Sequence, residues 1–290
     1  MEVRQLTYFV KAAETLHFTD AAAAIYVTQS TLSQQIKQLE EELGMLLFDR
    51  IGKHVVLTEA GQVFLEHARR ILSEIDKARQ AIIDLNTSVS GELKIGTTYA
   101  FSSLLLPVLS PFTQKYPHIK ILVDYDAPGA LEKKLRMSEL DFILSFHNHP
   151  GDEDLNSQPL FASRIVMVVA KTHSLAALKK VTLKEIGKLN LVLPGKGFIS
   201  RDFLDELFAK NDIIPKVRIE LNDVHSLLSL VRDENWVTVL NEKALMGWEE
   251  LVPIPITGKE LSKQSFILWQ KGAYRKKAAL LFVEEVFKKL

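Results

Sequence analysis

Apolar residues recur at helical spacing along the first 45 positions and predict three short helices. The first apolar face consists of Leu6, Phe9, Val10, Ala13 and Leu16. Thr19 stands before Asp20 and a run of alanines, which is typical of an N-capped second helix that ends near Tyr26. The third helix has an apolar face of Leu32, Ile36, Leu39 and Leu43, and Gly44 ends it. The pattern predicts a compact helical module with a polar break at residues 27–30.

The period changes after the third helix. Residues 48–57 combine a basic turn with a short apolar strand, so they predict a small hairpin, and Thr58 then caps a long helix. The apolar stripe of that helix consists of Phe64, Ala68, Ile71, Ile75, Ala78, Ile82 and Leu85. Because this stripe covers about three heptads between charged positions, it favours pairing with a second copy of the helix. The alternative is a helix packed on its own domain.

The rest of the chain alternates strands and helices. A polar linker at 86–91 precedes strands at 93–96, 119–124 and 142–146 and helices at 101–115 and 129–137. The order recurs with strands at 191–193, 217–221 and 236–240 and helices at 200–210 and 224–233. Strands at 163–170 and 266–269 and a helix at 274–290 complete the pattern. Two such blocks predict two α/β lobes with parallel-rich mixed sheets.

These patterns predict three domains. Residues 1–58 form a helical module with a hairpin, 59–90 form the linker and dimerisation helix, and 91–290 form a two-lobed domain. Lobe I comprises 91–161 and 266–290, and lobe II comprises 162–265. The chain crosses between the lobes near 160–165 and 262–266.

Charge and composition narrow the function classes. The formal net charge is zero, and residues 1–90 carry nine basic and twelve acidic side chains. Any nucleic-acid contact therefore depends on a few placed groups rather than on a basic domain. The absence of cysteine excludes disulfides, thiolate metal sites and thiol nucleophiles, and it fits a reducing cytoplasm. No apolar run is long enough for a membrane span, and no signal peptide is visible.

The third helix has the features of a DNA-reading helix. Its N-terminal residues would meet base edges if it entered a major groove, and the amide of Gln34 or Gln35 suits adenine. The candidate DNA contacts are Thr19, Thr28, Gln29, Ser30, Thr31, Ser33, Gln34, Gln35, Lys37, Arg50, Lys53 and His54. The last three lie at the hairpin tip, where a backbone or a minor groove would pass. The alternative is a small helical interaction module whose polar residues are merely solvated.

Several blocks of residues 1–60 closely resemble the N-terminal domain of LysR-type transcriptional regulators. The blocks are residues 4–10, 18–22, 27–36, 39–44, 47–50 and 57–61, at the mutual spacing of that family. The remainder resembles the family's effector domain in length, linker and lobe order. The resemblance implies a winged helix-turn-helix, a dimerising linker helix and a two-lobed domain similar to periplasmic binding proteins.

The resemblance also implies partners. Such a protein would be a homodimer or homotetramer on promoter double-stranded DNA, would communicate with RNA polymerase, and would respond to a small-molecule effector between the lobes. Two positions depart from the family pattern. Ser30 stands where proline is common, and Gln34 stands where arginine is common. The second change removes a guanine or phosphate contact and introduces an adenine reader, so the operator preference of relatives does not carry over.

The effector site is expected where strands lead into helices at the edge of each sheet. The candidate effector residues are Thr97, Thr98, Tyr99, Ala100, Phe101, Ser102, Pro128, Ser145, Phe146, Gly197, Phe198, Ser200, Arg201 and His225. Helix N-termini and the guanidinium of Arg201 favour an anionic ligand. For each residue the alternative is a turn or cap role, with Ser200 as an N-cap and Arg201 in a surface ion pair.

Enzyme signatures are weak. The glycine spacing of residues 91–96 fails as a phosphate loop because Thr97 replaces the required lysine, and no Gly-x-Ser-x-Gly motif occurs. His147 and His149 are interpreted as part of a solvated turn, so no metal and no cofactor are expected. The sequence predicts a regulator without catalytic activity. The alternatives are a periplasmic-type solute-binding protein or α/β enzyme with an incidental helical N-terminus, and a regulator that has lost its ligand.

Overall fold

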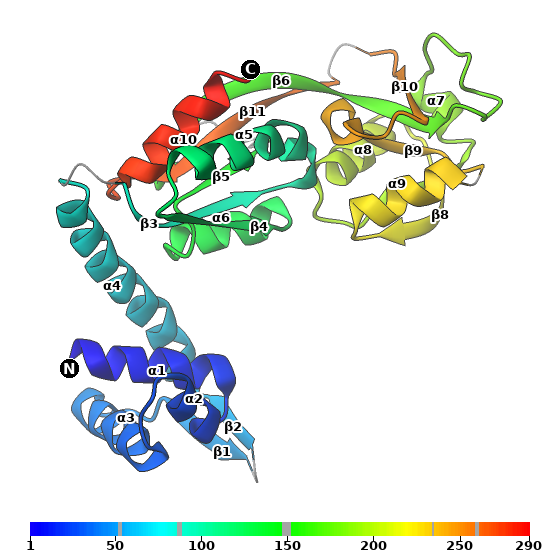
Figure 1. Cartoon of the computed structure of the whole chain (residues 1–290). Helices are drawn as coiled ribbons and strands as arrows, with labels where there is room; N and C mark the ends of the chain where they lie inside the picture. Colours follow the sequence, from blue (N-terminus) through cyan, green and yellow to red (C-terminus); the bar gives the residue numbers. More distant parts are fainter. Residues whose placement is uncertain (52–53, 86–88, 147–151, 234, 259–260) are drawn as a thin grey trace. The chain divides into compact units, whose positions relative to one another are not determined.

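The computed structural model describes residues 1–51, 54–85, 89–146, 152–233, 235–258 and 261–290 (Figure 1). The chain forms two compact units. The first comprises Met1–Asn86 together with Met137–Glu139, and the second comprises Thr87–Arg136 together with Leu140–Leu290. None of the described helices is long and apolar enough to cross a membrane.

Three helices pack around an aromatic centre in the first unit. They are α1 (Val3–Thr15), α2 (Phe18–Ala24) and α3 (Gln29–Leu43). The ring of Phe9 is fully buried and lies 5.5 Å from that of Phe48 and 5.1 Å from that of Phe64. Most residues of the apolar faces predicted for the first and third helices supply this core, with Leu32, Ile36 and Leu39 all buried, whereas Leu16 and Leu43, predicted on the same faces, are exposed.

The helix ends follow local capping chemistry. Thr28 caps α3 by accepting a hydrogen bond from Thr31 N, and Gly44 ends the helix in a left-handed conformation. The predicted cap of the second helix is wrong. His17 occupies that N-cap and its Nδ1 accepts from Asp20 N at 3.4 Å, so Thr19 lies inside α2 and is exposed. Phe18 is the first residue of the helix.

The predicted hairpin and long helix complete the first unit. Strands β1 (Phe48–Ile51) and β2 (His54–Leu57) pair antiparallel, and α4 (Glu59–Ile83) begins at Thr58, whose hydroxyl accepts from Gly61 N at 2.9 Å. Gly61 allows a close approach at this corner, because a Cβ there would lie 2.1 Å from Leu47 O. The helix is thereby held against the segment before the hairpin.

A mixed sheet forms the framework of the second unit. Its strands are β3 (Gly91–Thr97), β4 (Ile119–Tyr125), β5 (Phe142–Ser145), β6 (Leu155–Ala170), β9 (Thr238–Asn241), β10 (Leu251–Pro255) and β11 (Ser262–Gln270). Strand β3 pairs parallel with β4 and β5, whereas β6 pairs antiparallel with β9, β10 and β11. A separate parallel pair consists of β7 (Asn190–Pro194) and β8 (Lys216–Leu221).

Helices cover both lobes. Lobe I carries α5 (Ser102–Lys115), α6 (Pro128–Arg136) and α10 (Lys277–Phe287), and lobe II carries α7 (Leu183–Ile186), α8 (Ile199–Lys210) and α9 (Val224–Asp233). Figure 1 shows α5 and α10 side by side on lobe I, and rings of Phe112 and Phe282 meet between them at 5.0 Å. Short 3-10 turns η1 (Tyr99–Phe101) and η2 (Glu242–Leu245) precede α5 and follow β9.

Two strands run through both lobes, which corrects the sequence prediction. β6 spans 16 residues rather than starting at 163, and β11 starts at Ser262 rather than at 266. The extra residues pair with each other, from Leu155 against Gln270 to Arg164 against Ser262, so antiparallel hydrogen bonding extends strands whose apolar pattern is weak. The pairing shifts register around Ser265, within the predicted crossover. The strand β10 and helix α7 had no counterpart in the prediction.

Candidate functional site

The N-terminal half of α3 presents a continuous polar surface. Thr28, Gln29, Ser30, Thr31, Gln34 and Lys37 are exposed, whereas Ser33 and Gln35 are half-buried. The opposite face of the same helix carries the buried core residues. A helix held by its apolar face, with its N-terminal polar face in solvent, has the arrangement that a major groove accepts.

Hydrogen bonds organise the hydroxyls at the start of α3. The Thr28 hydroxyl lies 3.0 Å from that of Ser30 and 2.8 Å from that of Thr31, and Gln29 Nε2 donates to Ser33 Oγ at 2.8 Å. These side chains are neutral donors and acceptors. They suit base edges and phosphate oxygens without adding positive charge.

The acidic residues in the last turns of α3 have structural roles. Glu40 Oε1 accepts hydrogen bonds from Leu47 N at 2.8 Å and Phe48 N at 3.1 Å, which fixes the segment that enters the hairpin. Glu41 forms an ion pair with Lys37 at 3.6 Å, and Glu42 pairs with the chain's N-terminal amine. The net acidity of this unit therefore includes carboxylates that hold the fold together.

For the candidate DNA-contact residues of the hairpin, the structure gives only the pairing of the backbone strands. Arg50 pairs with Val55 in the β1–β2 register, and His54 pairs with Ile51. Lys53 lies outside the described residues. The roles of these three residues remain predictions from sequence.

The predicted dimerisation stripe divides into two parts along α4. Ala68 is fully buried and Phe64 packs on the core of its own unit, as the alternative reading of the stripe requires. Farther along, Ile71 is 38% exposed, Ile82 68% and Leu85 81%, and Ala78 is also exposed. Ile75 is half-buried. The apolar surface left for a partner therefore begins near Ile71.

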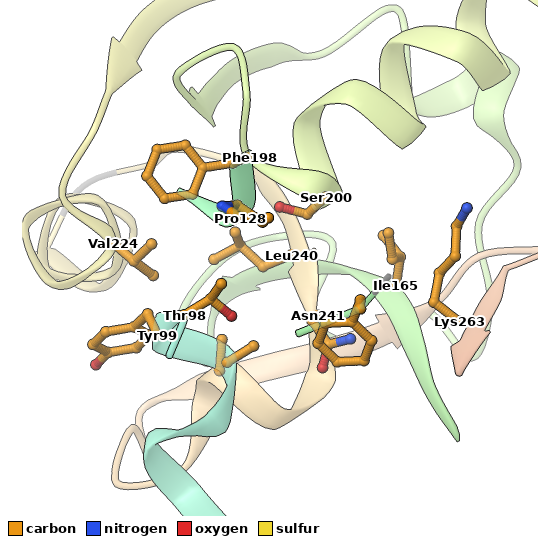
Figure 2. A pocket seen from close by; sticks show the side chains of 13 residues that line it. Thr98, Tyr99, Pro128, Ile165, Phe198, Ser200, Val224, Leu240, Asn241 and Lys263 are labelled. Atoms are coloured by element: carbon orange, nitrogen blue, oxygen red, sulfur yellow. The ribbon is translucent and has the colours of Figure 1, made fainter. Parts of the chain in front are cut away.

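A small cavity lies between lobes I and II. Its volume is about 50 Å³, and its lining consists of Thr98, Tyr99, Ala100, Pro128, Phe146, Ile165, Phe198, Ser200, Val224, Leu240, Asn241, Ala244 and Lys263. Figure 2 shows the rings of Phe198 and Tyr99 on one side with Val224 between them, and Asn241 across from them. We refer to this space as the inner cavity.

The inner cavity contains a few polar groups in an apolar wall. Thr98 and Ser200 bring hydroxyls, and Ser200 lies in the first turn of α8. The Oδ1 of Asn241 accepts from Ser163 Oγ at 2.8 Å and from Lys243 N at 3.0 Å, so its amide nitrogen is the group it can offer a ligand. Burial lowers the pKa of Lys263, whose Nζ lies 4.1 Å from the centre of the Phe203 ring. Figure 2 shows that amine directed away from the cavity centre.

A larger outer chamber of about 930 Å³ adjoins the inner cavity. Its lining consists of Tyr99, Ser102, Ser103, Leu106, Tyr125, Asp126, Ala127, Phe198, Asn222, Asp223, Val224, Lys243, Ala244, Met246 and Gly247. A hydrogen bond from Lys134 lowers the pKa of Asp126, and hydrogen bonds from Ser226 lower that of Asp223. Both carboxyls are therefore ionised at neutral pH, and an anionic group is better placed in the inner cavity.

Eight of the predicted effector residues line these two spaces. They are Thr98, Tyr99, Ala100, Ser102, Pro128, Phe146, Phe198 and Ser200. Six do not: Thr97, Phe101, Ser145, Gly197, Arg201 and His225. Thr97, Phe101 and Ser145 are fully buried: Thr97 ends β3, Ser145 ends β5, and Phe101 ends η1 and packs in the lobe I core. The Ser145 hydroxyl has no hydrogen-bond partner among the described residues.

Arg201 differs most from its predicted role. Its side chain is 5% exposed and donates to Asp205 at 2.8 Å, to Glu220 at 2.8 Å and to Pro194 O at 2.9 Å. The guanidinium thus joins α8 to β7 and β8 through ion pairs with two partly exposed carboxylates, so it takes the ion-pair role that was the alternative to a ligand contact. Ser200 is likewise not the N-cap of α8, which is Phe198. His225 stacks on Trp248, with ring centres 5.0 Å apart.

Sequence reasoning missed the part of the lining that comes from the strand crossover and from η2. The missed residues of the inner cavity are Ile165, Val224, Leu240, Asn241, Ala244 and Lys263. Strand-to-helix junctions are visible in a sequence, but the pairing that brings β6, β9 and β11 to the cleft floor joins distant segments. Val224 begins α9 just after β8 and so lies at such a junction, whereas no local signal marks the other positions.

Comparison with known proteins decides the family. Residues 3–62 match the model of the bacterial regulatory helix-turn-helix protein, lysR family, and residues 86–290 match that of the LysR substrate binding domain. The chain belongs to the LysR family. GltC, a transcriptional dual regulator of Bacillus subtilis, is 32% identical over 83% of this chain and 81% of its own length. The transcriptional activator CmpR of Synechocystis is 27% identical over 98% of this chain and 94% of its own.

Solved structures show the same LysR-family fold. Full-length OxyR from Pseudomonas aeruginosa has a TM-score of 0.76 at 24% identity and covers 99% of this chain and 94% of its own. CbnR complexed with its target DNA has a TM-score of 0.71 at 23% identity and covers 100% of both chains. The regulatory domain of Synechocystis CcmR in complex with 2-PG has a TM-score of 0.62 at 19% identity, covering 69% of this chain and 97% of its own.

The LysR-family match confirms the predicted regulator and does not favour the solute-binding or enzymatic alternatives. The metal-like pair His147 and His149 lies outside the described residues. Within the described ranges, no group of three potential metal ligands gathers.

Proposed function

We propose that this LysR-family transcriptional regulator reads promoter double-stranded DNA with the exposed N-terminal face of α3. The observation that carries the proposal is the arrangement of Ser30, Thr31 and Gln34 on a helix whose opposite face is locked into the core. Gln34 reads a base edge, and Lys37 and the hairpin residues Arg50, Lys53 and His54 meet phosphates or the minor groove. Thr19, Thr28, Gln29, Ser33 and Gln35 complete the contact surface.

The lack of net positive charge in the DNA-reading unit makes oligomerisation necessary for tight DNA binding. The DNA-reading unit is net acidic, so a single copy binds weakly and two or four linked copies supply the affinity through avidity. The exposed later turns of α4, from Ile71 to Ile83, together with Leu85 just beyond the helix, provide the surface for a homodimer, and two dimers form the homotetramer. The protein acts in the cytoplasm, where it contacts RNA polymerase at the promoter.

The cleft between the lobes binds the effector. The inner cavity offers the hydroxyls of Thr98 and Ser200 and the amide of Asn241, a donor set that suits a small oxyanion such as a carboxylate. Effector binding in the cleft changes the arrangement of lobes I and II, and this change alters the contacts that the tetramer makes with the promoter.

A mobility-shift assay with the DNA upstream of the protein's own gene and of the neighbouring divergent gene tests the DNA proposal. We expect a specific complex that competitor DNA of unrelated sequence does not remove. No complex at low salt with either fragment would overturn the proposal.

Substitutions on α3 test the contact assignment. Gln34→Ala is expected to change base preference at one operator position, with a cost of roughly 1–3 kcal/mol at the preferred base. Lys37→Ala is expected to weaken binding to all sequences and to lower the salt slope by about one. Gln38→Ala is the matched control, because Gln38 is exposed on the same helix one turn farther from its N-terminus. Equal losses for all three variants would contradict the assignment.

A further inference from the structure

The inner cavity and the outer chamber share a wall. Tyr99, Phe198, Val224 and Ala244 line both spaces. The inner cavity holds about 50 Å³ and the outer chamber about 930 Å³, whereas pockets for small molecules are typically on the order of 300–1,000 Å³. A ligand larger than a few atoms therefore cannot reach the donors of the inner cavity unless part of this wall moves.

One hydrogen bond across the lobes holds the wall. Trp248 Nε1, from lobe II, donates to the hydroxyl of Tyr99, from η1 of lobe I, at 3.3 Å. Trp248 is buried and fixed from α9, where the His225 ring lies 5.0 Å from it and the Arg232 guanidinium 5.7 Å. Tyr99 is half-buried and lines both spaces. Of the two partners, Tyr99 is the one with room to move.

The outer chamber has the lining of a site for an apolar body. Leu106, Tyr125 and Met246 are 56%, 45% and 57% exposed around it. Exposed apolar side chains that gather around one hollow are typical of a ligand-binding groove. The rings of Tyr99, Tyr125 and Phe198 add flat faces against which an aromatic ligand stacks.

We propose that Tyr99 is the gate between two compartments of the effector cleft, held shut by its hydrogen bond to Trp248. The effector has a flat apolar body, which rests in the outer chamber, and a small oxyanion head, which displaces Tyr99 to reach Thr98, Ser200 and Asn241. This inference rests on the proposed effector function and adds the ligand class and the gating residue.

The gate has a thermodynamic consequence. Opening it breaks the hydrogen bond between two neutral groups, and the free energy of that bond subtracts from the binding free energy of the oxyanion head. The apolar body binds in the outer chamber without opening the gate, so its affinity does not depend on this bond. Removing either partner of the hydrogen bond lowers the free energy needed to open the gate. Tyr99→Phe removes the acceptor oxygen and keeps the ring, and Trp248→Phe removes the donor and keeps an aromatic side chain. Both variants are expected to shift binding in the same direction.

Calorimetry on the full chain tests the compartments with three probes: indole as body, acetate as head, and indole-3-acetate as both. We expect indole-3-acetate to bind roughly three- to tenfold more tightly to Tyr99→Phe and to Trp248→Phe than to the unchanged protein. Indole affinity should stay unchanged, and the double variant should gain nothing more. Tyr116→Phe is the control, because Tyr116 also lies in lobe I but packs on Phe112, with ring centres 4.7 Å apart, and belongs to the lining of neither space.

Amide hydrogen exchange provides a test without ligand. Faster exchange is expected at residues 99–105 and 245–251 in both gate variants and not in Tyr116→Phe. Unchanged exchange in both segments, or equal gains for indole alone, would overturn the gate. If exchange becomes faster but none of the three probes binds, the gate stands and the proposed ligand class is wrong. If a wider screen of small molecules then also finds no ligand, the proposed effector function is wrong.

Discussion

At the scale of single residues, Arg201 stabilises lobe II by joining three elements. It is the buried cation of a cluster whose carboxylates, Asp205 and Glu220, are 37% and 47% exposed. Because water screens those carboxylates, the cluster contributes less than a fully buried pair would. We expect Arg201→Met to lower the free energy of unfolding by about 1–3 kcal/mol. Chemical denaturation measures this, with Arg218→Met on the exposed face of β8 as control.

The same cluster makes lobe II sensitive to acid. The hydrogen bond from Arg201 lowers the pKa of Glu220 below its usual value. The stabilisation is therefore present above the pKa of an unfolded glutamate and is lost as the pH falls through the folded-state pKa. We expect the stability of the unchanged protein to fall more steeply below about pH 5 than that of Glu220→Gln. Parallel acid dependences of the two proteins would show that this pair does not contribute.

Tyr26 illustrates strain in the first unit. It is 96% exposed and has a φ of 57°, a conformation that disfavours side chains other than glycine, asparagine and aspartate. Tyr26→Gly should therefore leave the fold intact and change its stability by less than about 1 kcal/mol, with strain relief offset by the greater freedom of the unfolded chain. Thermal denaturation measures it. A loss well beyond that range would mean that the exposed ring has a structural role.

At the scale of elements, α4 combines two functions along its length. Its first turns pack on the helical core, and its later turns expose Ile71 and Ile82, with Leu85 exposed just beyond the helix end. Ile82→Asp should abolish the proposed dimerisation and leave the monomer folded, because the Ile82 side chain is 68% exposed. Analytical ultracentrifugation measures the assembly state, and circular dichroism checks the fold.

A matched control for that variant is Gln62→Asp, also exposed on α4 but outside the stripe. Dimers that persist in Ile82→Asp would contradict the role of the stripe, and loss of dimers in both variants would indicate a general effect on α4.

Sequence patterns were a good guide to elements with strong local signals. The apolar faces of α1 and α3, the Thr58 cap and the α5 and α9 helices all carry such signals, and the structure has them. The pairing between strands could not be predicted from the sequence. The length of β6, the strand β10 and the cleft residues Asn241 and Lys263 depend on hydrogen bonds between distant segments. Arg201 was misjudged because a sequence does not show that Glu220, on another strand, lies beside it.

At the scale of the whole second unit, the lobes are coupled by β6 and β11. Ser265 is fully buried where these strands pass between the lobes, and its Oγ donates to Phe161 O at 2.6 Å and accepts from Phe161 N at 3.1 Å. Ser265→Ala should lower the free energy of unfolding by about 1–3 kcal/mol, since it leaves buried backbone groups without partners. Fluorescence of Trp269 in lobe I and of Trp236 in lobe II should report coincident transitions.

Those measurements use single-tryptophan variants of the full chain. Separate transitions for the two lobes before any change at Ser265 would mean that the shared strands do not make the unit cooperative. Ser262→Ala is the control, because Ser262 lies on the same strand and is exposed.

The shared strands also set an order for biosynthesis. The chain needed for α1 to α4 is complete within the first 83 residues, whereas lobe I lacks β11 and α10 until residues 262–287 have been made. Since domains fold as they emerge, the DNA-reading unit matures while β5 still presents an open edge to other chains. A translation product that stops before residue 262 would carry an intact DNA reader without a finished effector lobe. Such fragments would occupy operators without responding to any signal, so rapid removal of incomplete chains would matter more for this protein than for one whose lobes are each continuous in sequence.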